Sequence, residues 1–590
     1  MKTSDRFINR ILRRYLFPTI LTILGTTITG FINSLIVGSR LGHEALAAIN
    51  VISSFTFLFA MLGCLISIGA SSAASVAIGR GEEERVGKYT TYSLVASIVI
   101  PVIISVLIML VYKELMTLQG VSNRLYHLSR EYSDLIIPFG FLTTLMYYPF
   151  NFLRLDGRAA EAMYIFGGMT VLDIVLVLSF TGAGLGLKGV AAAVVMSTAV
   201  ADAAGIACMF RNKESNVIKL LRFSAADIGW LTKSVWSRGG AAGLNNLCNM
   251  LRTMILNAWI LKYFGAGSAA VFAVACAIIN LTSASVSGGG QTIVPLTGIF
   301  YGERDSSSLK ILMNSGIRYT LVIHAVLLAA VIPLAGPIAG AFGLKGTPEA
   351  AQAAEAIIWI MVSLIPASVL NVFIFYYSTL KKVLLSCLLV FLRSLGFVLL
   401  FSAIFIFGAG GRHLYASFLL AELFTLAVML IAGYVSGVRH SRKYGFLYID
   451  RMPEQNYISF SVGSSTEGAV EASKRMAEFC DEHEVDAKVK SFLPMAIEEM
   501  LLTINEQCLK DQPDGSVDVR IYIDEDGLIM RVRCGGIKFD PVAWYKEKSA
   551  NMTAEEMLLD DALGMKMIIS RASEVMYQNT FGTNNLIVIL

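Results

Sequence analysis

The chain has 590 residues, of which 55% are hydrophobic and only 16% are charged, and its mean hydropathy is +0.63. Soluble globular proteins carry about 25% charged residues, so this composition excludes a purely soluble protein and indicates a membrane protein. The formal net charge of +4 averages two unlike parts, since 1–440 hold long apolar runs while 457–590 are rich in Glu, Asp and Lys. The eight cysteines show no metal-ligand spacing, so we expect neither a disulfide framework nor a metal site.

The first element is an apolar run preceded by basic residues, "MKTSDRFINRILRRYLFPTI". It resembles a signal peptide, but no small-residue cleavage site follows, so we predict a retained membrane helix. A spanning helix needs about 20 mostly apolar residues. Twelve segments meet this requirement, near 15–37, 47–78, 89–112, 132–153, 160–182, 188–210, 238–263, 268–299, 317–343, 350–380, 383–408 and 413–436.

The distribution of Lys and Arg predicts the orientation of these segments. An even number of spans places both termini on the same side. The N-terminus and the even-numbered loops hold many basic residues, such as Arg13, Arg85 and Arg154, and the opposite loops hold few. Cytoplasmic loops carry the excess of Lys and Arg. We therefore predict a multi-pass protein of a bacterial-type plasma membrane, with both termini and the soluble tail in the cytoplasm.

Two segments about 220 residues apart share the placement of glycines, small residues and charged residues around their apolar spans. This similarity indicates an internal repeat of the kind found in transporters. The first is "LGHEALAAINVISS…GASSAASVAIGRGEEERVGKYTTYS", and the second is "FGAGSAAVFAVACAIIN…GGGQTIVPLTGIFYGERDSSSLKILMNSG". We predict an all-α polytopic membrane protein of twelve helices in two six-helix bundles, residues 1–225 and 226–440. A linker at 441–456 would lead to a small α/β sandwich domain at 457–590.

Several motifs resemble the recurring segments of the multidrug and toxic compound extrusion (MATE) family. They are "GFINSLIVGSRLGHEALAAIN", "FLRLDGR", "LDIVLVLSFTGAGLGLKGVAAAVV" and "QTIVPLTGIFYGER". The resemblance covers roughly residues 10–440, with the motifs in order. It implies two bundles around a central cavity that opens alternately to each side. It also implies efflux of organic, usually cationic, compounds driven by entry of protons or sodium ions.

Asp173 stands in the middle of the apolar run "GGMTVLDIVLVLSF". A charged residue at the centre of a bilayer costs about 2.5–3.5 kcal/mol on insertion scales and marks an ion or proton path. A site that excludes water favours the protonated carboxyl group, which suits a group that binds and releases a proton. The resemblance implies that Asp173 belongs to the cation site of the first bundle. A permanently neutral carboxyl group locked to a polar neighbour is the alternative.

Two neighbours of this site depart from the family pattern. Asn33 stands where the family often has Asp, and Met169, one turn before Asp173, stands where it often has Asn. One acid with few supporting oxygens suits a proton better than a sodium ion, since hard cations take several oxygen ligands. We therefore favour proton over sodium coupling.

The second bundle carries charges of both signs. The run "GLNNLCNMLRTMILN" holds Asn246 and Arg252, and Arg393 and Glu422 stand in the last two spans. Arg393 and Glu422 would form a structural ion pair, or the arginines would face the cavity and favour an anionic or zwitterionic substrate. Asp202, in the sixth span, is a further candidate near the cytoplasmic end.

The tail resembles the histidine-kinase-like ATPase fold of anti-sigma-factor serine kinases, in "LPMAIEEMLLTIN", "VRCGGIKFDP" and "DALGMKMIISRASEVMYQNTFGTNNLIVIL". Glu499 matches the general base that the resemblance implies. The magnesium-binding Asn position falls on Thr503, the adenine-binding Asp position falls on Cys534, and the glycine loop keeps only Gly564. We therefore expect a vestigial nucleotide site, doubtful ATP binding and a regulatory role; a stabilising cap is the alternative.

The function that we predict is cation-coupled antiport of small organic compounds by alternating access, with the tail as a regulatory domain. One alternative is a membrane-anchored ligand sensor whose tail binds a cytoplasmic signalling protein. A second is a flippase of a lipid-linked or anionic substrate, with which Arg252 and Arg393 are compatible. We expect no enzyme activity, no cofactor beyond the coupling ion, and no nucleic-acid partner.

Overall fold

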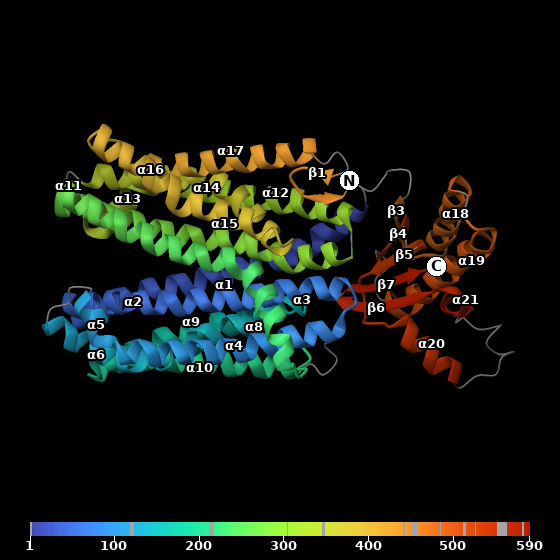
Figure 1. The fold of residues 1–590 in the computed structure, drawn as a ribbon, viewed down its shortest axis with the longest axis horizontal. Coiled ribbons are helices and arrows are strands. Elements are labelled where there is room, and N and C mark those ends of the chain that lie inside the picture. The colour runs from blue at the N-terminus through green and yellow to red at the C-terminus, as the bar shows by residue number, and fades with distance from the viewer. Residues whose placement is uncertain are drawn as a thin grey trace. The chain divides into compact units, whose positions relative to one another are not determined.

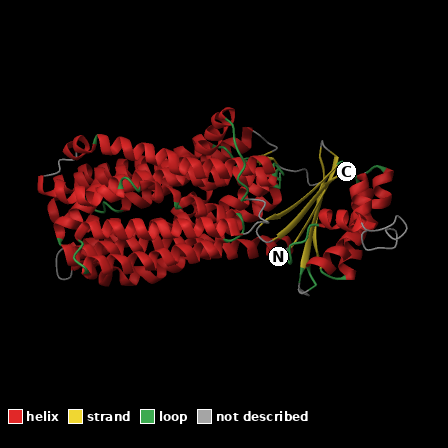
Figure 2. Ribbon diagram, turned by 90° about the horizontal axis from the view of Figure 1, so that it is seen from below, coloured by secondary structure: helices red, strands yellow, loops and turns green. Residues whose placement is uncertain are grey.

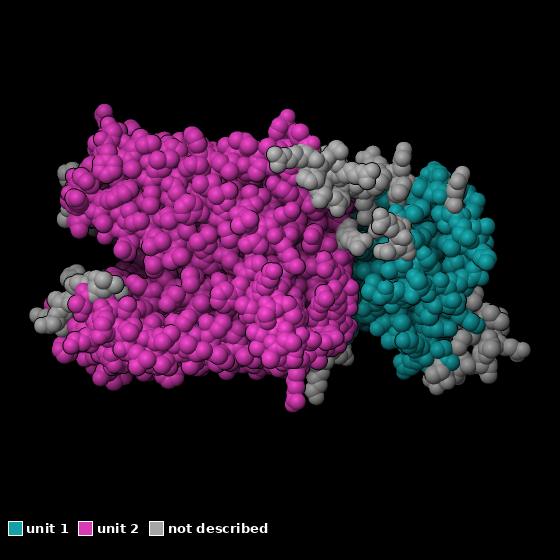
Figure 3. All heavy atoms as spheres, viewed as in Figure 1, with its two compact units in different colours: residues 1–11, 450–590 teal, residues 12–449 magenta. Residues whose placement is uncertain are grey.

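The protein is described here by a computed structural model that separates into two compact units. One unit comprises residues 12–449, and the other comprises 450–590 together with 1–11 (Figure 3). Each unit encloses hydrophobic clusters of its own. The structure describes residues 3–118, 123–211, 218–303, 305–344, 349–439, 443–450, 457–483, 485–510, 515–524, 527–550, 563–580 and 583–590.

Helices are the only regular secondary structure among the described residues of the first half of the larger unit (Figure 1). A π-helical turn, η1 (Cys64–Ile68), joins α2 and α3 into one continuous span. The helices are α1 (Thr3–Leu41), α2 (His43–Gly63), α3 (Gly69–Gly79), α4 (Glu83–Leu110), α5 (Tyr112–Leu118), α6 (Asn123–Ile136), α7 (Gly140–Leu145), α8 (Tyr147–Leu155), α9 (Ala159–Gly182) and α10 (Gly186–Arg211).

The second half lies beside the first in Figure 1, with α14 to α17 opposite α2, α4, α9 and α10. It begins with α11 (Ala225–Gly302), which breaks at Gly265. There follow α12 (Ser306–Val331), η2 (Ile332–Leu334), α13 (Ala335–Ala339), η3 (Gly340–Leu344), α14 (Glu349–Thr379), α15 (Val383–Phe391), η4 (Leu392–Gly396), α16 (Phe397–Ala403), η5 (Ile404–Gly408), α17 (Ala416–Arg439) and the short strands β1 (Lys443–Tyr444) and β2 (Ile449–Asp450).

The described residues contain 10 helices that are long and apolar enough to cross a membrane, or up to 11 if the bent pair Leu125–Ile136 and Gly140–Leu155 is one span. The sequence predicted twelve. The difference is the segment 238–263, which is helical but does not qualify as an apolar span. It carries Asn245, Asn249 and Arg252 among its apolar residues. The all-α membrane fold is confirmed, and this helix is more polar than its neighbours.

The internal repeat is visible in the backbone of the two halves. Gly42 and Gly265 both have a positive φ, of 86° and 77°, at the start of a long span. Gly157 and Lys381 likewise have φ of 89° and 59°. The residue after each of them donates a backbone hydrogen bond to the fifth residue before it, at 2.8 Å in the first half and 2.9 Å in the second. These turns recur about 220 residues apart, the spacing expected of an internal repeat.

The two halves pack closely at the end of the unit that carries Gly79 and Gly302. A Cβ at Gly79 would collide with the carbonyl oxygen of Ile299, and one at Gly302 would collide with the carbonyl oxygen of Val76. Arg154 also crosses between the halves, because its guanidinium donates to the carbonyl oxygen of Gln291 at 2.7 Å. At the opposite end, a notch separates the two halves (Figure 3). The contact between the halves is therefore concentrated at one end.

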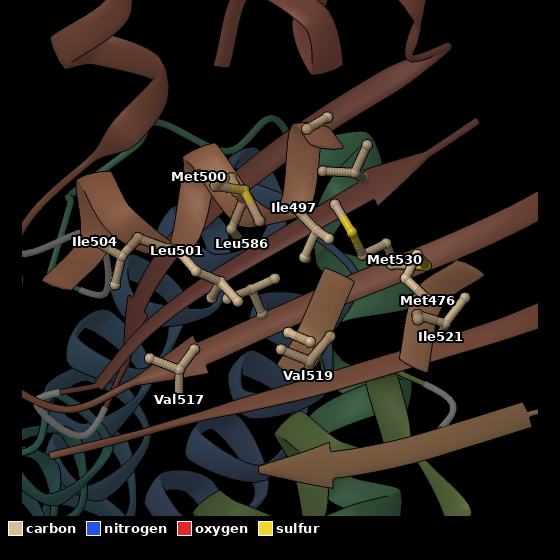
Figure 4. Packing of buried hydrophobic residues seen from close by; sticks show 14 of the residues in the cluster. Met476, Ile497, Met500, Leu501, Ile504, Val517, Val519, Ile521, Met530 and Leu586 are labelled. Atoms are coloured by element: carbon tan, nitrogen blue, oxygen red, sulfur yellow. The ribbon is translucent and has the colours of Figure 1, made fainter. Parts of the chain in front are cut away.

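The smaller unit is an antiparallel sheet with helices packed on it (Figure 2). The strand order is β3-β4-β5-β7-β6. Side chains from the helices meet alternate residues of the strands, including Val517, Val519 and Ile521 (Figure 4). The elements are β3 (Tyr457–Gly463), α18 (Thr466–Glu482), α19 (Ala487–Cys508), β4 (Ser516–Asp524), β5 (Gly527–Cys534), α20 (Pro541–Ala550), α21 (Leu563–Arg571), β6 (Glu574–Thr580) and β7 (Thr583–Ile589).

Candidate functional site

Asp173 lies on α9 and is buried, with 4% of its surface exposed. Its carboxylate accepts two hydrogen bonds from other helices. Nδ2 of Asn33 on α1 donates to Oδ2 at 2.5 Å, and Oγ of Ser197 on α10 donates to Oδ1 at 2.9 Å. The three residues lie far apart in the sequence, so it is the packing of α1, α9 and α10 that makes the site.

The carboxylate of Asp173 forms no ion pair with a basic side chain among the described residues of the chain. Its two partners are an amide and a hydroxyl, which carry no charge. Oδ1 of Asn33 is buried and has no hydrogen-bond partner among the residues that the structure describes. An uncharged amide can serve both forms of a carboxyl group, because its NH2 donates to a carboxylate and its carbonyl oxygen accepts from a carboxylic acid. The geometry thus suits a group that gains and loses a proton in place.

Met169 and Asp202 do not take part in these hydrogen bonds. Met169 is half-buried one turn before Asp173 on the same helix. Asp202 is further along α10 with 2% of its surface exposed, and both of its carboxylate oxygens are buried without a hydrogen-bond partner among the described residues. A buried carboxyl group in this state is costly in its charged form. Asp202 is therefore a separate buried acid, apart from the hydrogen-bonded site.

The second half contains a cavity of its own, with about 720 Å³ of space including its open mouth. Its lining is mostly polar, with charged, amide and hydroxyl side chains from α11, α14, η4 and α17. The charged residues are Arg252, Arg393 and Glu422. The polar uncharged residues are Asn245, Asn249, Asn280, Asn371, Thr282, Ser283, Ser287, Ser363 and Ser394.

Arg393 and Glu422 form an ion pair on the wall of this cavity. Nη2 of Arg393 is 2.9 Å from Oε1 of Glu422, and its Nη1 donates to Oδ1 of Asn371 at 3.3 Å. The two interpretations of these residues therefore coincide, since they are paired and also face the cavity. Asn246 was predicted as a cavity residue but is not on the lining; Asn245 and Asn249 are, because residues four apart share a helix face.

Several residues of these sites escaped the sequence analysis. Ser197 stands in the small-residue run "AAAVVMSTAV", where a serine resembles an ordinary helix-packing residue. Asn371 was missed as well, although it stands inside the long apolar helix α14. An amide in such a position is a signal that could have been read, since polar residues inside spans are rare and functional.

The four positions of the tail that the resemblance matches to a nucleotide site lie on α19, β5 and α21. Glu499 and Thr503 lie one turn apart on α19, and the Thr503 hydroxyl donates to the carbonyl oxygen of Glu499 at 3.0 Å. Sγ of Cys534 lies 3.6 Å from Sγ of Cys508, and both thiols are buried. Gly564 lies in the first turn of α21. The hydroxyl of Thr503 and the sulfur of Cys534 are both engaged within the domain.

Two repeated helical halves, packed at one end and parted at the other, with polar sites inside each half, define a membrane transporter of the two-lobe type. The chain belongs to the MatE family, whose model matches residues 18–178 and 241–404. This is a family of transporters rather than of enzymes. The matched segments do not include 457–590, so they do not address the tail.

Individual relatives agree with this assignment. The chain is 29% identical over 212 residues to the Probable multidrug resistance protein YoeA of Bacillus subtilis (strain 168). That match covers 33% of this chain and 44% of YoeA, which is less than half of the relative's length.

Solved structures share the fold of the membrane unit. A structure described as the outward-facing conformation of a multidrug resistance MATE family transporter of the MOP superfamily matches with a TM-score of 0.69 and 21% identity, over 74% of this chain and 97% of that one. A MATE structure in the straight conformation matches with a TM-score of 0.69 and 20% identity, over 75% and 100%. The Vibrio cholerae MATE transporter VcmN, as a mutant, matches with a TM-score of 0.68 and 18% identity, over 75% and 100%.

Proposed function

We propose that the protein is a proton-coupled antiporter that exports small organic compounds by alternating access. The observation that carries this proposal is the Asp173 carboxyl group, buried on α9 and held by Asn33 and Ser197 without a basic partner among the described residues. The family assignment supports transport, and the printed descriptions of the relatives support small organic compounds as the class of substrate.

Proton binding fits this site better than sodium binding. A hard cation takes several oxygen ligands, whereas the described neighbours of Asp173 present an NH2 group and one hydroxyl to the carboxylate. A proton needs one carboxyl oxygen and one acceptor. On protonation, rotation of the Asn33 amide would bring its carbonyl oxygen to the new O–H, so both states of Asp173 keep a hydrogen bond.

The conformation described here fits one of the two states between which an alternating-access transporter changes. The halves meet through Gly79 and Gly302, next to loops whose basic residues we assign to the cytoplasm, and they part at the opposite end (Figure 3). With both termini in the cytoplasm, this is a state open to the outside. Rocking of residues 1–225 against 226–440 would then open the cytoplasmic end.

The soluble tail serves as a regulatory domain in this proposal rather than as an ATPase. Residues 441–456 would be the linker, and a cytoplasmic protein would be the partner of 457–590. The engaged Thr503 hydroxyl and the buried Cys534 thiol support the absence of nucleotide chemistry.

The proposal is tested by dye transport into proteoliposomes under imposed gradients. Rhodamine 123 uptake should respond to a pH gradient and not to a sodium gradient, and Asp173→Asn should abolish the response. Glu84→Ala, an exposed change on α4, is a control that should transport normally. Uptake driven by sodium alone would overturn proton coupling, and unchanged transport by Asp173→Asn would remove Asp173 from the mechanism.

A further inference from the structure

The cavity of the second half holds a positive charge that no carboxylate of the described chain neutralises. Arg252 lines this cavity and is buried, with 9% of its surface exposed. Its guanidinium lies over the ring of Phe418, 5.4 Å from the ring centre. Among the described residues, no hydrogen bond or ion pair is formed by this side chain.

The remaining charges of the cavity cancel each other. Arg393 and Glu422 form their own pair, with Nη2 and Oε1 2.9 Å apart. Oε2 of Glu422 is buried and has no hydrogen-bond partner in the described part of the chain. Two guanidinium groups thus face one carboxylate, and the cavity carries one unmatched positive charge.

An unmatched guanidinium inside a membrane domain is energetically unfavourable. A bound anionic group would offset this cost. Arginine offers a planar fork of donors that fits carboxylate, phosphate and sulfonate groups with two parallel hydrogen bonds. The amides of Asn245 and Asn249 and the hydroxyl groups on the lining supply further donors. The apolar remainder, including Ile279, Leu364 and Phe418, would contact a hydrocarbon or aromatic body.

The charged residues of this cavity lie on helices that are equivalent, in the internal repeat, to those that form the site of Asp173. In the first half, Asn33, Asp173 and Ser197 come from α1, α9 and α10. The corresponding helices of the second half are the first part of α11, the span of α15, η4 and α16, and α17, and they carry Arg252, Arg393 and Glu422. The same three helices of the repeat therefore hold an excess acid in one half and an excess base in the other, although Asp173 and Arg393 stand at different positions along them.

We propose that the cavity around Arg252 binds the anionic group of a small amphiphilic substrate, either a zwitterion or an organic anion. This inference deepens the proposed transport function and rests on it, because a bound molecule is a substrate only if the protein transports it. Binding itself is independent of proton coupling, because the two sites lie in different halves of the unit.

A pair of dyes that differ in one carboxyl group tests the proposal. Rhodamine 110 carries a free carboxylate, and rhodamine 123 is its methyl ester. Fluorescence polarisation on full-length protein in phosphatidylcholine nanodiscs, without any gradient, gives both dissociation constants. We expect rhodamine 110 to bind about tenfold more tightly or better, as a charge-assisted bidentate hydrogen bond would give. Equal affinities, or tighter binding of the ester, would overturn the proposal.

Variants assign the preference to Arg252. Arg252→Gln should lose the preference for rhodamine 110 while its affinity for rhodamine 123 and its thermal unfolding stay close to wild type. Arg252→Lys, which keeps the charge without the fork, should keep a reduced preference and covers the case in which Arg252→Gln does not fold. Glu84→Ala, the exposed change on α4, should keep the full preference. A preference that survives in Arg252→Gln, or is absent from a folded Arg252→Lys, contradicts the assignment.

The same assay distinguishes a free substrate from a lipid headgroup as the source of the anion. Nanodiscs that contain phosphatidylglycerol should leave the binding of rhodamine 110 unchanged if the cavity takes a free amphiphile. Competition by that lipid in the wild type, and not in Arg252→Gln, would overturn the free substrate in favour of the headgroup. If the dye binds as expected but proteoliposomes show no proton-driven transport, the proposed function fails and the binding site stands.

Discussion

Nδ2 of Asn33 lies 2.5 Å from Oδ2 of Asp173, across 140 residues of sequence and between the helices α1 and α9. This contact joins the buried acid of the first site, on α9, to the first helix of the chain. Because Asn33 is uncharged, Asp173 is left free to change its protonation state. A basic residue in its place would hold the carboxylate permanently charged.

Replacement of Asn33 should therefore impair coupled transport more than replacement of Ser197. Asn33→Leu removes the amide that orients the carboxyl group; loss of the partner that orients a metal-binding side chain costs about 10–100-fold, and we expect a loss of this order. Ser197→Ala removes one of two hydrogen bonds and leaves the amide in place, so a smaller loss is expected. Initial rates of dye transport at equal protein amounts measure both. A fully active Asn33→Leu protein would show that the contact is only structural.

The close contact between the halves at Gly79 predicts that a single added methyl group weakens the packing between them. Gly79→Ala places a Cβ against the carbonyl oxygen of Ile299, and overpacking of this kind costs about 1–3 kcal/mol. We expect destabilisation of the state described here and greater access of a thiol reagent to a cysteine introduced at Ser75. Gly167→Ala is the matched control, because nothing lies within 4 Å of the added atom. Equal labelling in the two variants would contradict tight packing at Gly79.

The tail should not bind ATP. Thr503 offers no amide for magnesium, and Cys534 is a poor acceptor for the amino group of adenine. In addition, the buried Cys508 thiol lies against Cys534, and this hydrogen bond lowers the pKa of Cys508 while it raises the pKa of Cys534. Titration of full-length protein with a fluorescent ATP analogue and magnesium should show no saturable binding. Saturation that is competed by ATP would restore a nucleotide-binding role.

The Asp227 carboxylate, at the start of α11, should make a pH-dependent contribution to the stability of the fold. The backbone N–H of Ser224 and the indole of Trp230 donate to its carboxylate at 2.8 and 3.0 Å, and the first of these is the main cause that lowers its pKa to about 2. An unfolded Asp has a pKa of about 3.9. The stabilisation is therefore present above about pH 4 and is lost as the pH falls toward 2.

Thermal unfolding at several pH values measures this contribution. Asp227→Ala should lower Tm by a few degrees at neutral pH, and the deficit should shrink in acid. Asp227→Asn, which keeps an acceptor oxygen without the charge, should show little change with pH in its difference from Asp227→Ala. A deficit of Asp227→Ala that is constant down to pH 2 would mean that the charge contributes nothing.

The acid of the first site could be predicted from the sequence because an ionisable residue inside an apolar run has few explanations. Ser197 could not, since its role depends on how α10 packs against α9. In the second half, the sequence identified Arg252, Arg393 and Glu422 but left open whether the last two were paired or faced a cavity. Distances between helices decide this, and they showed that both are true.

The helical fold was predictable because length and hydropathy define most spans directly. The segment 238–263 was predicted as a span; it is a helix in the structure, but it falls short of the hydropathy of the other spans and lines a cavity. An apolar sequence with four asparagines does not reveal which face of the helix is turned to lipid. The tail's alternation of strands and helices was visible in the sequence. The contact between the thiols of Cys534 and Cys508 was not, since the two residues meet only through the fold.

Proton uptake by the reconstituted protein tests the central claim most directly. The pH of a weakly buffered suspension is lowered from about 8 to about 6 without substrate, and the protons bound by wild type and by Asp173→Asn are compared, because burial favours the protonated carboxyl group. Our account predicts that the wild type binds more protons per chain than the variant over this range. Coincident uptake curves would contradict it and would mean that the Asp173 carboxyl group does not exchange a proton.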